Sequence, residues 1–208
     1  PDMDTDAPVL EAKGCVLPGL VDCHTHLVFG GDRIDEAAAR FAGVSYQEIA
    51  KQGGGIRSTV RATRASSDEA LVERGVARAK ALLAGGVTTI EAKSGYGLST
   101  KDELRLLAAV AQVADASGVN LIATYLGAHS VPEGSTREDY VREVIETQLP
   151  AVIEQGIAQA CDVYCDEGAF TLGETLRILR EAKRLGLAVK AHLGQFVDLG
   201  GVQAVAEL

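Results

Sequence analysis

The feature that most constrains the fold of this chain is a series of short apolar segments that alternate with helix-like stretches. Five such segments end abruptly in polar or glycine residues; they cover residues 20–29, 86–93, 119–126, 160–165 and 187–192. Their nearly continuous apolar character fits strands of a parallel sheet that are buried on both faces. The later strand ends, at Lys93, His129, Asp166 and His192, are 36, 37 and 26 residues apart. The spacing therefore predicts one strand and one helix per repeat.

The stretches between these segments carry signals for helix starts and ends. Capping-box patterns, in which Ser or Thr precedes Glu by three residues, begin at Ser66, Thr100, Ser135 and Thr171. Glycine stands where each helix is expected to end, at Gly85, Gly118, Gly156 and Gly186. Residues 53–55 are three glycines in the long interval before the second strand, and they predict a loop tip or a helix entry there.

Five βα units fit either a (β/α)8 TIM-type barrel or an open doubly wound sheet. Neither Gly-x-Gly-x-x-Gly nor a P-loop pattern follows the first strand, which weakens the nucleotide-binding alternative. The chain begins at Pro1 rather than Met, and its 208 residues fall short of the roughly 250 that a complete barrel needs. We therefore expect residues 1–208 to form one partial α/β barrel domain of a longer protein.

Charge and composition exclude several classes of partner. The chain has 20 Lys and Arg against 29 Asp and Glu, a net charge of −9, which argues against binding to nucleic acid or an anionic membrane. No apolar run approaches the roughly 18 residues of a membrane span, and no secretory signal is visible. Four scattered cysteines do not make a disulfide framework, so we expect a reducing cytoplasm.

All four histidines, His24, His26, His129 and His192, lie in or just after predicted strands. In parallel α/β folds the active or ligand-binding site lies at the carboxyl ends of the strands. His24 and His26 are two positions apart, so both imidazoles can lie on one side of a strand, about 7 Å apart. A His-x-His pair alone is often incidental, and the joint placement of all four favours a metal site. His192 could supply a third ligand, and imidazole ligands leave zinc and iron both open.

Three further residues follow the predicted strands. Arg33 comes after the first strand, Tyr96 stands between glycines after the second, and Gln195 follows His192 by three positions. Arg33, Tyr96 and His129 on adjacent strand ends would bind a small carboxylate well. Taken singly, Arg33 is better explained as a surface ion pair and Tyr96 as loop packing. The cluster of Arg33, Tyr96 and His129 favours binding of a carboxylate.

Residues 18–26, Pro-Gly-Leu-Val-Asp-Cys-His-Thr-His, resemble the first-strand motif of the amidohydrolase superfamily of metal-dependent barrels. Other segments are similar to one member of that superfamily, an enzyme of histidine degradation; they are residues 26–33, 53–60, 91–98, 126–129 and 190–192. The Lys-Ser-Gly-Tyr-Gly-Leu and Leu-Gly-Ala-His segments are the more specific ones. The resemblance covers the chain from about Ala12 to its end.

The resemblance implies a metal-dependent hydrolase that opens the ring amide of 4-imidazolone-5-propanoate to N-formimidoyl-L-glutamate. By matching position it implies one divalent ion, zinc or iron, on His24, His26 and His192. It also implies that Arg33, Tyr96 and His129 hold the substrate and that Gln195 contacts its ring. The aspartate ligand and the acid–base groups would lie beyond Leu208, so the catalytic residues stay unknown. We expect the 208-residue chain alone to be inactive.

Two other functions remain open. One is a different enzyme of the superfamily, such as a deaminase of a nucleobase-like ring, in which a neutral substrate would leave Arg33 without a carboxylate. The other is a non-catalytic half-barrel module. The expected partner is a small substrate bearing a carboxylate, with no nucleic acid and no membrane, and a homodimer is left open.

Overall fold

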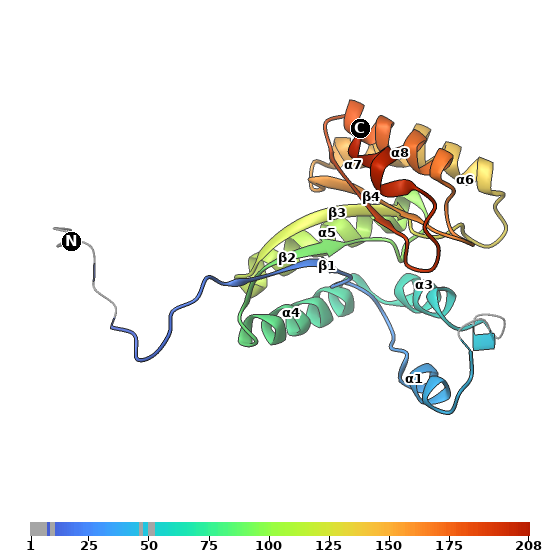
Figure 1. Cartoon of the computed structure of the whole chain (residues 1–208). Helices are drawn as coiled ribbons and strands as arrows, with labels where there is room; N and C mark the ends of the chain where they lie inside the picture. Colours follow the sequence, from blue (N-terminus) through green and yellow to red (C-terminus); the bar gives the residue numbers. More distant parts are fainter. Residues whose placement is uncertain (1–7, 9–10, 46–47, 50–52) are drawn as a thin grey trace.

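Five strands form one parallel sheet in a computed structural model that describes residues 8, 11–45, 48–49 and 53–208. The strands are β1 (Leu20–Thr25), β2 (Val87–Lys93), β3 (Asn120–Ala128), β4 (Ala160–Cys165) and β5 (Ala188–Leu193), paired in that order. The order never reverses, as it would at the switch point of a doubly wound sheet. The sheet curls as half of a barrel (Figure 1), which confirms the predicted α/β barrel class.

Helices follow the strands in the predicted alternation. They are α1 (Ile34–Phe41), α3 (Ile56–Ala65), α4 (Asp68–Ala84), α5 (Thr100–Ser117), α6 (Arg137–Glu143), the π-helix η1 (Val144–Gln148), α7 (Leu149–Gln155), α8 (Leu172–Arg184) and α9 (Gly201–Ala206). Figure 1 shows α4, α5 and α8 along the outer face of the sheet, while α1 and α3 lie beyond the carboxyl end of β1. No helix among the described residues is long and apolar enough to cross a membrane.

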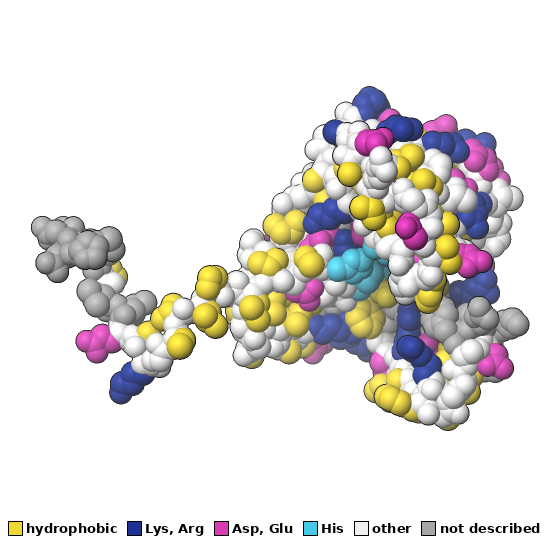
Figure 2. All heavy atoms as spheres, in the orientation of Figure 1, with side chains coloured by type: hydrophobic (Ala, Val, Ile, Leu, Met, Phe, Trp, Pro, Cys, Tyr) yellow, Lys and Arg dark blue, Asp and Glu magenta, His cyan; other side chains and the backbone are white. Residues whose placement is uncertain are grey.

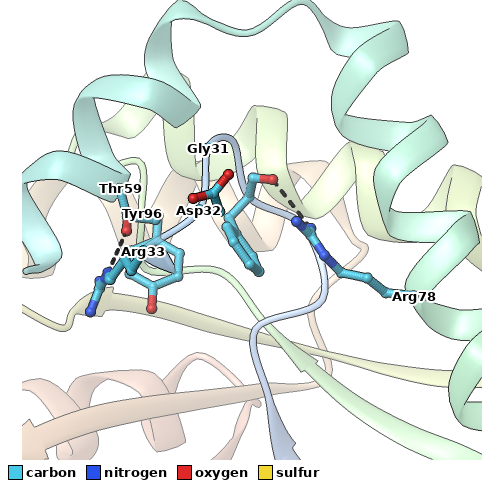
Figure 3. A pocket seen from close by; sticks show the side chains of 7 residues that line it. Gly31, Asp32, Arg33, Thr59, Arg78 and Tyr96 are labelled. Atoms are coloured by element: carbon cyan, nitrogen blue, oxygen red, sulfur yellow. Dashed lines mark hydrogen bonds between the residues drawn. The ribbon is translucent and has the colours of Figure 1, made fainter. Parts of the chain in front are cut away.

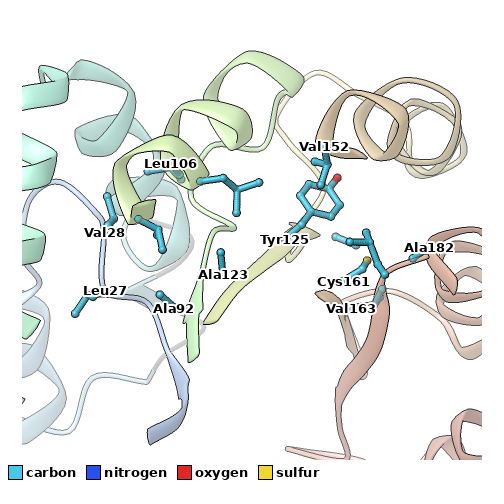
Figure 4. Close-up of a cluster of buried hydrophobic side chains, with 14 of the residues drawn as sticks. Leu27, Val28, Ala92, Leu106, Ala123, Tyr125, Val152, Cys161, Val163 and Ala182 are labelled. Atoms are coloured by element: carbon cyan, nitrogen blue, oxygen red, sulfur yellow. The ribbon is translucent and has the colours of Figure 1, made fainter. Parts of the chain in front are cut away.

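The hydrophobic core lies between the sheet and its helices. Ala92, Ala123 and Cys161 of neighbouring strands belong to one buried cluster with side chains of the outer helices, such as Leu106 of α5 and Ala182 of α8 (Figure 4). Tyr125 is buried in this layer, and its hydroxyl donates to Oε1 of Gln148 at 2.6 Å. Burying this apolar area stabilises the fold by roughly 25 cal/mol per Å².

The inner face of the same strands is polar. Glu91 and Lys93 of β2 and Asp162 of β4 are buried there, at positions that alternate with the outward apolar ones. The prediction of strands that are apolar on both faces was therefore too simple. The curled sheet buries a charged network in the interior of the half-barrel, directly below the strand ends.

The first strand ends earlier than predicted, at Thr25 rather than at position 29. The pairing of β1 with β2 shifts register between Asp22 and Thr25. The carboxylate of Asp22 accepts the backbone N–H of His24 and the hydroxyl of Thr25, which turns the side chain back on its own strand. His26 consequently lies just beyond the sheet, at its carboxyl edge.

Three predicted helix starts are displaced by one residue. The hydroxyls that cap α4, α5 and α6 belong to Ser67, Ser99 and Thr136, so the predicted caps at Ser66, Thr100 and Ser135 are wrong. In each case two hydroxyl residues are adjacent, and either could serve as a cap. Thr171 alone among the four forms the predicted capping box, with Glu174. The four glycines do stand at or next to helix ends, and Gly55 is the N-cap residue of α3.

Candidate active site

A cavity of about 1250 Å³ opens at the carboxyl ends of the strands. All seven residues predicted for the site lie on its wall: His24, His26, Arg33, Tyr96, His129, His192 and Gln195. The histidine side chains gather in one patch on the face shown in Figure 2. The barrel topology thus brings together residues that are up to 171 positions apart in the sequence.

The imidazole rings form a continuous cluster. The ring centroid of His24 lies 5.1 Å from that of His192 and 6.1 Å from that of His26. His26 stacks on His129 with the centroids 4.7 Å apart. On the far side, His192 stacks on Tyr164 at 4.5 Å, and Tyr164 also lines the cavity. Tyr164 was not predicted, because a tyrosine inside an apolar strand gives no signal of its own.

Burial keeps two of these imidazoles neutral. Desolvation lowers the pKa of His129 to about 4, although its hydrogen bond to Gly95 opposes the shift. Desolvation, together with His129, lowers the pKa of His26 well below its usual value. A neutral imidazole can donate a lone pair to a metal ion or accept a hydrogen bond.

The donor set fits a divalent metal ion. His24, Asp162 and His192 each offer one ligand atom, and these atoms lie within 4.8 Å of one another. His26 does not belong to this close triplet, but its Nδ1 is buried and has no hydrogen-bond partner among the described residues. The same holds for Oδ1 of Asp162. A buried acceptor without a partner is costly, and a bound cation is one group that can satisfy it.

Asp162 is the main residue that the sequence reasoning missed. Its Oδ2 lies 3.1 Å from Nδ1 of His192 and 2.8 Å from Nζ of Lys93, and Lys93 also pairs with Glu91. Burial alone would raise the pKa of Asp162, but His192 and Lys93 outweigh it and lower the pKa to about 2. The available signal was a set of charged residues at alternating positions inside otherwise apolar strands.

Arg33 is held at the rim of the cavity by a neighbouring helix. Its Nε donates to Oγ1 of Thr59 on α3 at 2.8 Å (Figure 3). Arg33 and Tyr96 also line a smaller adjoining cavity of about 340 Å³. Arg78 of α4 supports this loop, because it donates to the carbonyl oxygen of Phe29 and lies 3.6 Å over the Phe29 ring. Arg33 therefore has a fixed anchor and faces both cavities.

Gln195 is exposed on the loop after β5 and reaches the wall of the large cavity. The loop is held from below by Asp166, whose two carboxylate oxygens accept the backbone N–H groups of Phe196 at 2.8 Å and Val197 at 3.1 Å. Burial would raise the pKa of Asp166, but these hydrogen bonds outweigh it and lower the pKa.

Comparison with known proteins identifies the family of this chain. The profile of the Amidohydrolase family matches residues 15–203. The chain belongs to that family. An imidazolonepropionase of Symbiobacterium thermophilum is 50% identical over 98% of this chain and 49% of its own length. One of Haloarcula marismortui is 45% identical over 96% of this chain and 48% of its own. The amidohydrolase chain thus spans about half the length of the curated relatives it matches.

A solved structure shares the fold. The crystal structure of an adenine deaminase from Arthrobacter aurescens superposes on this amidohydrolase with a TM-score of 0.57. The match covers 92% of this chain and 62% of the other, at 16% sequence identity. At that identity the likeness shows the barrel-type fold and carries no information on the substrate.

Proposed function

We propose that this chain forms the metal- and substrate-binding part of a hydrolase that opens the ring amide of 4-imidazolone-5-propanoate, giving N-formimidoyl-L-glutamate. The observation that carries the proposal is the single cavity that unites an imidazole cluster with Arg33 and Tyr96. The imidazolonepropionase relatives, at 45–50% identity, support the same substrate.

Arg33 pairs with the propanoate carboxylate in this proposal. A guanidinium binds a carboxylate through two parallel hydrogen bonds, which fixes the orientation of the substrate as well as its charge. Thr59 occupies Nε, so the terminal nitrogens remain for the substrate. This local positive charge selects an acidic substrate in spite of the net charge of −9.

The imidazole cluster supplies the reactive end of the cavity. His24 and His192 of the close triplet, together with His26, whose Nδ1 is buried without a partner among the described residues, would hold one divalent ion, zinc or iron. Asp162 orients His192 through its Nδ1. When bound, such an ion supplies Lewis-acid activation of water and of a carbonyl group. His129 keeps its Nδ1 proton on Gly95, so its neutral Nε2 can accept a hydrogen bond from the substrate. Tyr96 and Gln195 close the cavity around the ring.

The described sheet is, in this proposal, the first part of an eight-stranded barrel whose remaining part completes the active site. β1 and β5 are the two edges of the sheet. Leu20 and Val21 of β1 have exposed fractions of 57% and 66%, as expected for a strand that lacks cover. The proton-transfer groups would come from that remaining part. A cytoplasmic location fits the substrate.

The test is turnover of 4-imidazolone-5-propanoate by the complete protein that contains this chain. We expect stoichiometric N-formimidoyl-L-glutamate, and a rise in KM of at least about a hundredfold for Arg33→Ala, since a charge-assisted pair is lost. Arg177→Ala is the matched control, because Arg177 forms a surface ion pair with Glu138 on α6. Unchanged turnover by Arg33→Ala would contradict the proposal. Ammonia release from adenine in place of ring opening would favour the deaminase alternative.

A further inference from the structure

The loop of residues 94–98, between β2 and α5, adopts a backbone that it would not keep without support. Gly95 has a φ of 104° and Leu98 a φ of 51°. The second value lies in the left-handed region, which is unfavourable for a residue with a Cβ. This loop carries Tyr96 into the large cavity. Groups outside the loop must therefore hold it in place.

Glu103 holds the loop from the first turns of α5. Its Oε1 accepts the backbone N–H groups of Gly97 at 2.8 Å and Leu98 at 2.7 Å, and its Oε2 accepts that of Gly95 at 2.8 Å. Glu103 is fully buried. The sequence pattern predicts a capping box in which Thr100 is the cap and Glu103 its partner. Ser99 is the cap instead, and the carboxylate of Glu103 is directed to the loop.

The same loop is connected to the histidine cluster through the carbonyl group of Gly95. The carbonyl oxygen of Gly95 accepts from Nδ1 of His129 at 2.9 Å. Gly95 thus accepts from His129 through its carbonyl oxygen and donates its N–H to Oε2 of Glu103. There is little room for adjustment, because a Cβ on Gly95 would lie 3.0 Å from Nδ1 of His129, and a Cβ on Gly97 would lie 2.6 Å from the backbone nitrogen of Glu103.

We infer that Glu103 is a positioning residue for substrate binding, which fixes Tyr96 and His129 relative to each other through the backbone of residues 94–98. The inference rests on the proposed function, in which both side chains contact the substrate. A carboxylate suits this role, because it can accept several N–H groups at once, and the backbone N–H groups of Gly95, Gly97 and Leu98 all donate to it. Its removal leaves three buried N–H groups to find other partners.

The test is Glu103→Gln in the complete protein. The amide keeps the size of the side chain but places an NH2 group against backbone donors. We expect KM for 4-imidazolone-5-propanoate to rise about tenfold or more, as for the loss of a charged hydrogen bond, with a smaller change in kcat. Metal content should stay at the wild-type value. Hydrogen exchange of the Gly95, Gly97 and Leu98 amides should become faster. Asp115→Asn, on the exposed side of α5, is the matched control.

A coupling measurement separates positioning from a general loss of structure. Both substitutions weaken the same contact, that of Tyr96 with the substrate. In a Tyr96→Phe background, Glu103→Gln should therefore raise KM less than it does in the wild type. Glu103→Asp keeps the charge but shortens the side chain, so that it no longer reaches all three N–H groups; it should also raise KM and serves if Glu103→Gln does not fold.

Two results would overturn the inference. One is faster amide exchange in Glu103→Gln with an unchanged KM, and the other is exchange that stays at the wild-type rate. Absence of imidazolone turnover by the wild-type protein would instead refute the proposed function, and the exchange measurement would still test the hold of Glu103 on the loop.

Discussion

Nδ1 of His192, which lines the large cavity, lies 3.1 Å from Oδ2 of the buried Asp162. An ionised carboxylate only accepts hydrogen bonds, so this contact places the proton of a neutral His192 on Nδ1 and leaves Nε2 free for a metal ion. Asp162 in turn is held by Lys93. The orientation of one imidazole thus depends on a charged network that is buried inside the half-barrel.

Asp162→Asn is expected to weaken metal binding by about 10- to 100-fold, because the amide holds the imidazole less firmly and lowers its basicity. The measurement is metal content by elemental analysis after dialysis against a graded series of chelator concentrations. Glu154→Gln, at an exposed position of α7, is the control. Wild-type retention of metal by Asp162→Asn would show that the contact does not orient a ligand.

Lys93→Met should lower the free energy of unfolding by about 3–5 kcal/mol, because it leaves the buried carboxylates of Glu91 and Asp162 without their shared cation. Lys190→Met is the comparison. Lys190 pairs with Glu91 at 2.7 Å but is 39% exposed, so its loss should cost about 0–1 kcal/mol. Urea unfolding of both variants measures the difference, and equal losses would contradict this account of the network.

Thr59→Val removes the hydroxyl that accepts from Nε of Arg33 and keeps the shape of the side chain. The guanidinium then loses its anchor, and in the complete protein we expect KM for the proposed substrate, 4-imidazolone-5-propanoate, to rise several-fold to about tenfold. Thr175→Val is a control of the same chemistry, because Oγ1 of Thr175 is buried without a partner among the described residues. Steady-state kinetics measure KM for both variants. Equal values would mean that substrate binding by Arg33 does not depend on its hydrogen bond to Thr59.

The strands and the placement of the site could be predicted because they follow from local patterns. Apolar runs indicate the strands. The carboxyl ends of the parallel strands of a barrel lie on one face, so residues at those ends come together there. Asp162 and Glu103 could not be predicted in the same way. Asp162 meets Lys93 only across two strand pairings, and Glu103 acts on a loop whose backbone turns in the left-handed region at Leu98. Such roles depend on three-dimensional contacts rather than on sequence spacing.

Asp166→Asn tests the support of the loop that carries Gln195, and its effect should depend on pH. The folded-state pKa of Asp166 is lowered below the unfolded value of about 3.9 by backbone hydrogen bonds from Phe196, Glu167 and Val197, against the effect of burial. Its contribution to stability is therefore present above the unfolded pKa and is lost as pH falls through the folded one.

The wild-type protein should accordingly be more stable than Asp166→Asn at pH 7, and the difference should shrink as pH falls below about 4. Unfolding by urea at pH 7, 5, 4 and 3 gives the difference directly. Asp198→Asn is the control on the same loop, because Asp198 accepts a single backbone N–H, from Gly200. A difference between wild type and Asp166→Asn that stays constant from pH 7 to 3 would mean that the Asp166 carboxylate does not hold this loop through its charge.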